Sequence, residues 1–490
     1  MNRKRIIIAA LWTFCGALSL LQAQTPWKGS YGVETSAVAF DGDVAPLWLT
    51  GNRNGMLSVD RKSGYLRADV GVQKGWKRGW GLNAGLSMAG GIHTFSKVWV
   101  QQAFAEVNWQ MLRLSLGAKE RTGFPLEKDL RLSSGMMVEG VNAKPIPQVR
   151  FSVDRFVDVP WTNGWLGIKG HLAYGWFTDD SWQEEFAAPS NLLAKEVLYH
   201  SKSAALKVGK EADFPWTFEL GITDVAQFGG VQYKKQDDGS LKELHRYPKG
   251  LKECWKVLFP VQESDSVNVT GNHVGSWTGA VTYHGKGWQA RVYLEHYFED
   301  HSQMFMEYGF WKDGQLGVEV TLPENRWVSK VLWEGLNTTD QSGPILYVGE
   351  AGAWTDIQIS GQDSYFNHGQ YGAWQHAGMG MTTPLIPGPA YTEGAIRYKS
   401  TRVKAHHLGV CGDPHRDWSY RLLASHVRHW GTYGLPLDKV RKQFSGLAEV
   451  TFHPAKLKGW SASCGVAMDR GNYLGNSAGL TVTLRKTGGF

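Results

Sequence analysis

Two stretches of this sequence place aromatic rings directly beside carboxylate, amide and imidazole side chains. The first runs from residue 179 to 183 and the second from 363 to 376. A flat apolar ring can cover the C–H face of a sugar while nearby polar groups bond to its hydroxyls. The residues that we predict to contact carbohydrate in this way are Asp179, Asp180, Trp182, Gln183, Tyr365, Tyr371, Trp374 and His376. The alternative is that these rings pack their loops against the rest of the fold.

Other residue patterns fit catalysis less well. Adjacent acidic residues, such as Glu184-Glu185 and Glu299-Asp300, suggest the carboxylate pairs of glycosidases, which lie about 5–10 Å apart. Each of these pairs is equally typical of a solvated loop or strand end. Residues 475–479 match the nucleophile-elbow pattern, but they lead into a β-strand instead of the required helix. We therefore expect no enzyme and assign no catalytic residue.

The histidines are numerous, but their spacing does not favour a metal site. His406 and His407 are adjacent, and His426 and His429 are three residues apart. On a β-strand both pairs point to opposite faces, so neither pair can share one ligand sphere. We expect no metal ion, and nothing in the sequence implies another cofactor.

Short segments of alternating polarity must position these side chains. Residues 98–107 and 112–117 alternate apolar and polar side chains and are separated by a tight turn. Strands of about ten residues with one apolar face are the signature of transmembrane barrels. The pattern persists to residues 480–485, and the chain ends on Phe490. We therefore predict an all-β fold in which one large antiparallel transmembrane β-barrel carries short helical or plug insertions.

The N-terminus predicts export. Arg3, Lys4 and Arg5 precede an apolar run from residue 6 to 21, and small residues follow, so we predict a signal peptide (residues 1–23) cleaved after Ala23. No later stretch approaches the roughly 20 apolar residues that a membrane helix needs. A helical membrane protein is therefore excluded, and the outer membrane of a Gram-negative cell is the expected location.

Charge and cysteine content limit the partners further. Removing the three basic residues of the leader lowers the formal net charge from +7 to about +4, which is too mild for a nucleic-acid partner. Cys254, Cys411 and Cys464 remain after cleavage. Three thiols allow at most one internal disulfide, and the sequence leaves open whether two of them pair.

The domain boundaries follow the change in pattern. Residues 24–62 contain no alternating strand and predict an N-terminal periplasmic, helical segment with a short helix near residue 47. The barrel is expected to fill residues 63–490, with insertions at 120–148, 231–276, 299–348 and 361–400. In the first insertion, Pro145 and Pro147 each lack a ladder donor and cannot sit in a central strand. We predict a plug, a helix-bearing loop or a lid there.

Some of the 23 tryptophans stand near the ends of predicted strands. Transmembrane barrels carry aromatic girdles at both membrane–water interfaces. The predicted girdle residues are Trp80, Trp99, Trp165, Trp216, Trp277, Trp288, Trp418 and Trp460.

Seven short motifs carry a family resemblance, namely Trp48-Leu49-Thr50-Gly51-Asn52-Arg53, Leu132-Ser133-Ser134-Gly135, Lys144-Pro145-Ile146-Pro147-Gln148-Val149-Arg150, Gly164-Trp165-Leu166-Gly167-Ile168-Lys169-Gly170-His171, Phe177-Thr178-Asp179-Asp180-Ser181-Trp182-Gln183, Leu198-Tyr199-His200-Ser201-Lys202 and Gln227-Phe228-Gly229-Gly230. Together they resemble the capsule-assembly Wzi family in the form found in Bacteroidetes. The resemblance covers roughly residues 45–230. The second half of the chain is similar to the family mainly in its general residue pattern and in its closing strand. It implies an outer-membrane barrel of about 18 strands with helical elements near the periplasmic side. Members of that family help attach capsular polysaccharide to the cell surface and act as lectins, not as enzymes.

The sequence therefore predicts an outer-membrane lectin that binds capsular or extracellular polysaccharide and helps hold the capsule at the cell surface. Its other expected partner is outer-membrane lipid, and a monomer is favoured. One rival is a diffusion channel or transporter, which would differ in having an open lumen. The other is an outer-membrane hydrolase, which would need a serine, a histidine and a carboxylate or amide within hydrogen-bond reach.

Overall fold

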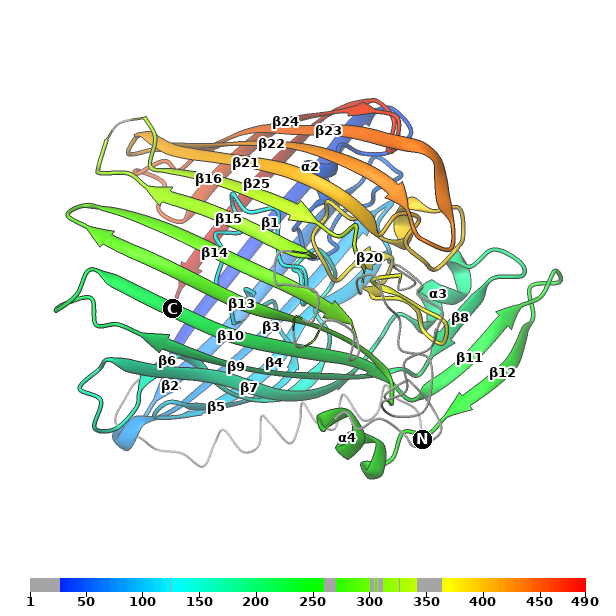
Figure 1. The fold of residues 1–490 in the computed structure, drawn as a ribbon. Coiled ribbons are helices and arrows are strands. Elements are labelled where there is room, and N and C mark those ends of the chain that lie inside the picture. The colour runs from blue at the N-terminus through cyan, green and yellow to red at the C-terminus, as the bar shows by residue number, and fades with distance from the viewer. Residues whose placement is uncertain are drawn as a thin grey trace.

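A computed structural model describes residues 27–123, 125–259, 270–299, 304, 306, 312–325, 327–341 and 364–490, so the predicted leader lies outside the described residues. Within that part of the chain, 18 strands form one closed antiparallel sheet (Figure 1). The strands of the barrel are β1 (Lys28–Asp41), β2 (Gly64–Gly75), β3 (Trp80–Ile92), β4 (Val98–Trp109), β5 (Leu112–Ala118), β6 (Gln148–Asp158), β7 (Leu166–Trp176), β9 (Leu198–Val208), β10 (Trp216–Phe228), β13 (Asn272–Gly285), β14 (Trp288–Glu299), β15 (Gly314–Thr321), β16 (Lys330–Asn337), β21 (Arg402–His415), β22 (Trp418–Gly431), β23 (Pro436–Phe452), β24 (Trp460–Gly471) and β25 (Ser477–Gly489). The predicted fold class is confirmed.

The barrel closes between its first and last strands. β1 pairs antiparallel with β25 on one side and with β2 on the other. Phe490, the terminal residue, exchanges two backbone hydrogen bonds with Gly29, at 2.8 and 3.0 Å. The alternating strand before the C-terminus is thus the closing strand.

The sequence pattern predicts no strand in residues 24–62, but β1 lies there. In the first half of β1 the apolar side chains point outward, and Tyr31 and Val33 are exposed. In its second half Val38 and Phe40 are buried instead. The apolar side of the strand changes because its second half packs against residues inside the barrel, and this change hides the alternation. The expectation of a strand-free N-terminal segment is therefore wrong.

The two ends of the barrel differ in their connections. The short-turn end carries the start of β1, the C-terminus and tight turns such as residues 110–111 and 286–287. The long-loop end carries the other connections, several of which form helices and strands of their own (Figure 1). Short turns on one side and longer loops on the other are typical of outer-membrane barrels.

Large apolar side chains face outward along the strands between the two ends. Those exposed by more than a third include Leu66, Val70, Leu86, Val107, Leu114, Leu116, Phe151, Ile168, Leu220, Val292, Leu408, Leu422, Val466 and Val482. Their neighbours along the same strands, such as Ser87, Ser115 and Ser152, are buried. A wall with an apolar outside and a polar inside is typical of a barrel in lipid.

Partly exposed aromatic side chains border the short-turn end. Trp80 and Trp109, for example, stack with ring centroids 5.9 Å apart. Six predicted girdle residues lie on this rim, namely Trp80, Trp165, Trp216, Trp288, Trp418 and Trp460. The prediction is wrong for Trp99, which is buried and donates its indole N–H to Gln101 at 2.9 Å. Trp277 lies within β13, nearer the long-loop end.

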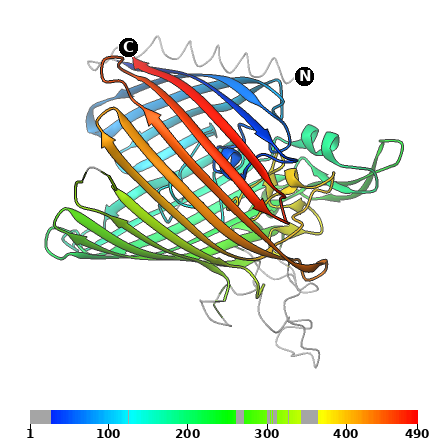
Figure 2. The same ribbon diagram turned by 90° about the horizontal axis from the view of Figure 1, so that it is seen from above.

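Three segments lie inside the barrel, and we call them together the plug. They are residues 42–63 with α2 (Leu47–Thr50), residues 119–147 between β5 and β6, and residues 364–400 before β21. Figure 2 shows the short blue helix α2 surrounded by the strands. The third segment contains only the two-residue strands β17 (Asn367–His368), β18 (Gly372–Ala373), β19 (Gln375–His376) and β20 (Met379–Gly380) and the turn η2 (Pro389–Tyr391). Buried side chains from all three segments share one apolar core with the wall.

The other predicted insertions are more regular than expected. Residues 299–348 contain barrel strands β15 and β16, so the prediction of an irregular insertion there is wrong. Each of these strands is only eight residues long, which left a weak alternation signal. Residues 231–276 contain most of the hairpin of β11 (Gly230–Lys235) and β12 (Leu241–Tyr247), the helix α4 (Leu251–Leu258) and the start of β13. β11 also pairs with β8 (Leu192–Lys195), which follows α3 (Asp180–Phe186).

No helix of the described residues is long and apolar enough to cross a membrane. The cysteines that remain after the leader, Cys254, Cys411 and Cys464, are free thiols.

Candidate ligand-binding cleft

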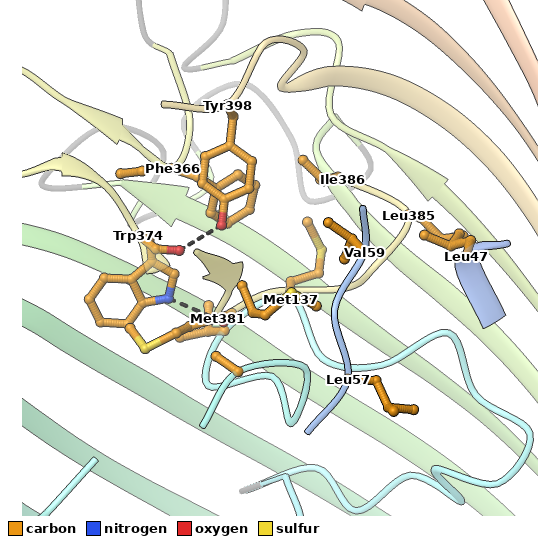
Figure 3. Close-up of a cluster of buried hydrophobic side chains, with 14 of the residues drawn as sticks. Leu47, Leu57, Val59, Met137, Phe366, Trp374, Met381, Leu385, Ile386 and Tyr398 are labelled. Atoms are coloured by element: carbon orange, nitrogen blue, oxygen red, sulfur yellow. Dashed lines mark hydrogen bonds between the residues drawn. The ribbon is translucent and has the colours of Figure 1, made fainter. Parts of the chain in front are cut away.

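The aromatic residues predicted in the second loop lie in the core of the plug. Tyr365, Tyr371 and Trp374 are at most 3% exposed. Trp374 donates its indole N–H to the Met381 carbonyl at 3.2 Å and accepts a hydrogen bond from the Tyr398 hydroxyl at 2.6 Å on its own carbonyl (Figure 3). Because these side chains are at most 3% exposed, they offer very little surface to a ligand in this structure.

His376 connects three separate segments. Its Nε2 accepts hydrogen bonds from the amide and hydroxyl of Thr178, at 3.2 and 3.0 Å, while its Nδ1 donates to the Lys144 carbonyl at 2.9 Å. These partners require a neutral imidazole, and burial lowers the pKa of His376 accordingly. The side chain therefore joins the plug to the connection after β7.

Asp179 and Gln183 make a second connection of this kind. The Asp179 carboxylate accepts hydrogen bonds from the Gln375 amide at 2.8 Å and from the Ala377 backbone N–H at 3.1 Å. The Gln183 side chain donates to Asp179 at 3.3 Å and accepts from the Ala194 backbone at 3.1 Å. Both residues are 3% exposed. Their polar atoms are used within the protein.

The structure thus separates the eight predicted site residues into two groups. Six are buried, and their burial favours the alternative, in which the residues pack the loops. The other two, Asp180 and Trp182, are partly exposed on α3. Asp180 accepts the Glu196 backbone N–H at 3.1 Å, and burial raises the pKa of Asp180. Trp182 lines an open cleft at the long-loop end.

This cleft has a volume of about 290 Å³ and is built from four connections at the long-loop end. They are the segment after α2, the turn between β3 and β4, the helix α3 and the last part of the plug. The lining residues are Gly55, Leu57, Ser58, Val59, Asp60, Arg61, His93, Thr94, Phe95, Trp182, Glu185, Phe186, Ala377, Met379 and Ala390.

An aromatic pair forms one side of the cleft. Trp182 and Phe186 are four residues apart on α3, so they share one helix face. Their rings are stacked, with centroids 4.5 Å apart and planes inclined by 17°. Trp182 also contacts Gly378, where an added Cβ would lie 2.5 Å from the indole and where φ is +87°. A glycine is therefore needed at this position to hold the indole in place.

Charged and polar side chains form the other side. Asp60 and Arg61 have side chains that are 60% and 66% exposed, and His93 is exposed as well. Glu185, which is also exposed, lies on α3 beside the aromatic pair. The Nδ1 of His93 bonds to the Lys62 carbonyl at 2.9 Å, which leaves the Nε2 edge of the ring for other contacts. The arrangement can stack a ring-shaped ligand and hydrogen-bond to groups at its edge.

The sequence identified one residue of this cleft and missed the others. The spacing of Trp182 and Phe186 was a readable signal once α3 was known to be a helix. Arg61, His93 and Phe95 gave no signal, because they come from separate connections that only the closed barrel brings together. Among the described residues, no group of three His, Cys, Asp or Glu side chains is placed to hold a metal ion.

The apolar outer band, the aromatic rim and the closed antiparallel sheet define an outer-membrane type of β-barrel whose interior contains a packed plug. No protein-family model and no curated protein matches the chain. Among solved structures, the chain is similar to Wzi from Escherichia coli, described as a carbohydrate-binding β-barrel of the outer membrane involved in group 1 capsule assembly. The TM-score is 0.57 at 11% identity, over 97% of this chain and 87% of that one.

Other solved barrels match less well. OccK11 (OpdR) of Pseudomonas aeruginosa gives a TM-score of 0.47 at 10% identity, over 95% of this chain and 96% of that one. OprD of the same organism gives 0.47 at 8% identity, over 95% of each chain. At these identities the likeness to Wzi shows the fold, and the two weaker matches carry no functional argument.

Proposed function

We propose that this barrel binds extracellular polysaccharide in the cleft beside Trp182 and thereby helps to hold a capsule at the cell surface. The observation that carries the proposal is the stacked pair of Trp182 and Phe186 facing exposed Asp60, Arg61 and His93. The likeness of the fold to a carbohydrate-binding barrel and the resemblance of the plug motifs to the Wzi family support it.

The position of the cleft agrees with an extracellular ligand. Outer-membrane barrels place short turns in the periplasm and longer loops outside the cell. All four connections that line the cleft lie at the long-loop end. A polymer at the cell surface would therefore reach the cleft without crossing the barrel.

The chemistry is that of a lectin with weak individual contacts. The indole covers one sugar face, and the charged groups bond to hydroxyl or carboxylate substituents. Affinity for a long polymer then rises because several protein molecules in the membrane engage one chain. In this proposal the buried residues, such as Asp179 and His376, contribute by fixing α3 and the end of the plug.

Binding of capsular polysaccharide to the purified protein in lipid nanodiscs tests the proposal. Trp182→Ala is expected to weaken binding about tenfold, which corresponds to about 1.4 kcal/mol. The matched control is Trp161→Ala, which removes a 96% exposed tryptophan at the opposite end of the barrel. Equal affinity for Trp182→Ala and the wild type would overturn the assignment of the cleft. Normal capsule retention in a deletion strain would overturn the cellular role.

The competing proposal is a diffusion channel. It predicts steady open-pore currents in a planar bilayer, whereas a barrel filled by its plug gives none. The buried core that the plug shares with the wall supports the lectin (Figure 3).

A further inference from the structure

The helix α4 and the residue that follows it present an apolar stripe that is largely exposed in the described fold. Leu251, Trp255 and Phe259 follow one another at intervals of four residues and are 84%, 64% and 59% exposed. The rings of Trp255 and Phe259 stack with centroids 5.6 Å apart. Residues four apart share one face of a helix, so the three side chains form a single surface.

The opposite side of α4 is fixed to the barrel wall. The Tyr174 hydroxyl donates to the Cys254 carbonyl at 2.9 Å, and Lys202 Nζ donates to the carbonyls of Val257 and Leu258 at 3.0 and 2.9 Å. Lys202 thus caps the C-terminal end of the helix, where a positive charge is favourable. Tyr174 and Lys202 alternate with inward-facing residues of β7 and β9, so they point outward, and Figure 1 shows α4 outside the barrel.

The helix covers a polar part of the outer wall. Lys202 forms an ion pair with Asp224 at 2.8 Å, and His273 lies 2.9 Å from the same carboxylate. Asp224 lies on the outward side of β10, in line with the exposed Phe218 and Leu220. Charged groups on the lipid side of a barrel are costly, more so with depth. Covering them with a helix that is apolar on its outer side removes that cost.

The height of α4 can be compared with the thickness of the apolar band. Asp224 lies eight residues beyond Trp216, which belongs to the aromatic rim at the short-turn end. At roughly 3.3 Å per residue this is about 26 Å of strand, or about 20 Å of height for a strand tilted by about 40°. The apolar band of such barrels is about 25 Å tall. Asp224, which Lys202 links to the C-terminal end of α4, therefore lies about 5 Å below the upper edge of the band, close to where acyl chains meet lipid headgroups.

We propose that α4 is an interfacial anchor that places Leu251, Trp255 and Phe259 in the outer leaflet of the membrane, at the boundary between acyl chains and headgroups. The stripe continues the lipid-facing surface of β9 and β10, and aromatic rings are favoured at this depth. Amphipathic helices bind such interfaces with the apolar face buried by about 5–10 Å. The anchor fixes how deep the long-loop end sits in the membrane.

A nitroxide at position 255 tests the proposal. The native Cys254, Cys411 and Cys464 are replaced by alanine, and Trp255→Cys is labelled in the full-length protein in nanodiscs of phosphatidylcholine and phosphatidylglycerol. Collisions with oxygen, which concentrates in lipid, are expected to exceed collisions with a water-soluble nickel complex several-fold. The matched control is Leu244→Cys on β12, an apolar side chain that is 45% exposed and for which the opposite ratio is expected.

Each outcome decides the question. A nickel-dominated signal at position 255, like that at position 244, would overturn the proposal, because it would place the stripe in water. A label shielded from both reagents would also overturn it, because another part of the protein would then cover the stripe. Heat-modifiable mobility in gels shows whether the barrel has folded, and Leu251→Cys serves as the second labelled position if Trp255→Cys does not fold.

Discussion

The wall and the plug of this protein belong to one chain, but different interactions hold them. In the wall, β13 and β14 pair without a break from Val274 opposite Glu299 to Gly285 opposite Trp288, and neighbouring pairs behave similarly. In the plug, residues 119–147 contain no helix or strand among those the structure describes. The wall is stabilised by many equivalent backbone bonds, whereas the plug is held by side-chain contacts, both in the apolar core and to polar groups of the wall.

Two carboxylates of the wall show how the plug is fixed. Glu334 on β16 accepts hydrogen bonds from the Ser133 hydroxyl at 2.7 Å and from the amide and hydroxyl of Ser134 at 2.7 and 2.6 Å. Glu295 on β14 forms an ion pair with Lys128 at 2.7 Å, and both side chains are completely buried. Single substitutions are therefore expected to loosen the plug while the wall remains closed.

The largest effect is expected for Lys128→Met. This change leaves the Glu295 carboxylate buried without its cation, a loss that typically costs about 3–5 kcal/mol. The result to measure is amide hydrogen exchange followed by mass spectrometry. Exchange should rise in residues 125–147 and stay slow in β13 and β14. Equal loss of protection in wall and plug would show that the two regions unfold together. It would contradict the view that different interactions hold them.

The junction of wall and plug should respond to pH. Asp313 precedes β15, and its carboxylate accepts a hydrogen bond from the hydroxyl of Tyr365 in the plug at 2.9 Å. Burial raises the pKa of Asp313 to about 7. Between about pH 4 and 7 the folded protein then holds a proton that the unfolded chain releases, so stability falls as the pH rises through this window.

Asp313→Asn is expected to remove this pH dependence. With about 1.4 kcal/mol per pKa unit, the change across the window is on the order of 2–4 kcal/mol. Thermal unfolding of the wild type and of Asp313→Asn, followed from pH 4 to 8, measures it. A wild-type curve that becomes more stable toward pH 7 would contradict the sign.

A smaller effect is expected where the plug meets the cleft. Asp179→Ala removes the acceptor for the Gln375 side chain and the Ala377 backbone, which typically costs about 1–3 kcal/mol. Exchange should rise in residues 375–380, and polysaccharide binding should weaken because Trp182 loses its support at Gly378. Asp180→Ala, one residue away and partly exposed, is the control. A larger loss for Asp180→Ala than for Asp179→Ala would refute the assignment.

The same contrast explains what the sequence could predict. The hairpin of β4 and β5 was readable because its alternation is local and its partner strand follows at once. The strand β1 could not be predicted, because its apolar residues change from the outer face to the inner face at Val38 and Phe40, just before the plug begins. The plug contacts join residues that are far apart in sequence, such as Ser133 with Glu334 and Asp179 with Gln375. Polar residues with distant partners look like surface residues, which is why Asp179 and His376 were predicted as ligand contacts.

The smallest effect is expected for Lys195→Met, which is the closest match to Lys128→Met. Lys195 on β8 pairs with Glu184 on α3 at 2.8 Å, almost the distance of the buried pair, but the two side chains are 26% and 46% exposed. Water screens this pair and solvates Glu184 once its partner is lost, so the cost should stay below about 0.5 kcal/mol. Thermal unfolding of the two lysine variants side by side isolates burial as the variable. If both lost equal stability, distance and not burial would determine how much a charge pair stabilises this protein.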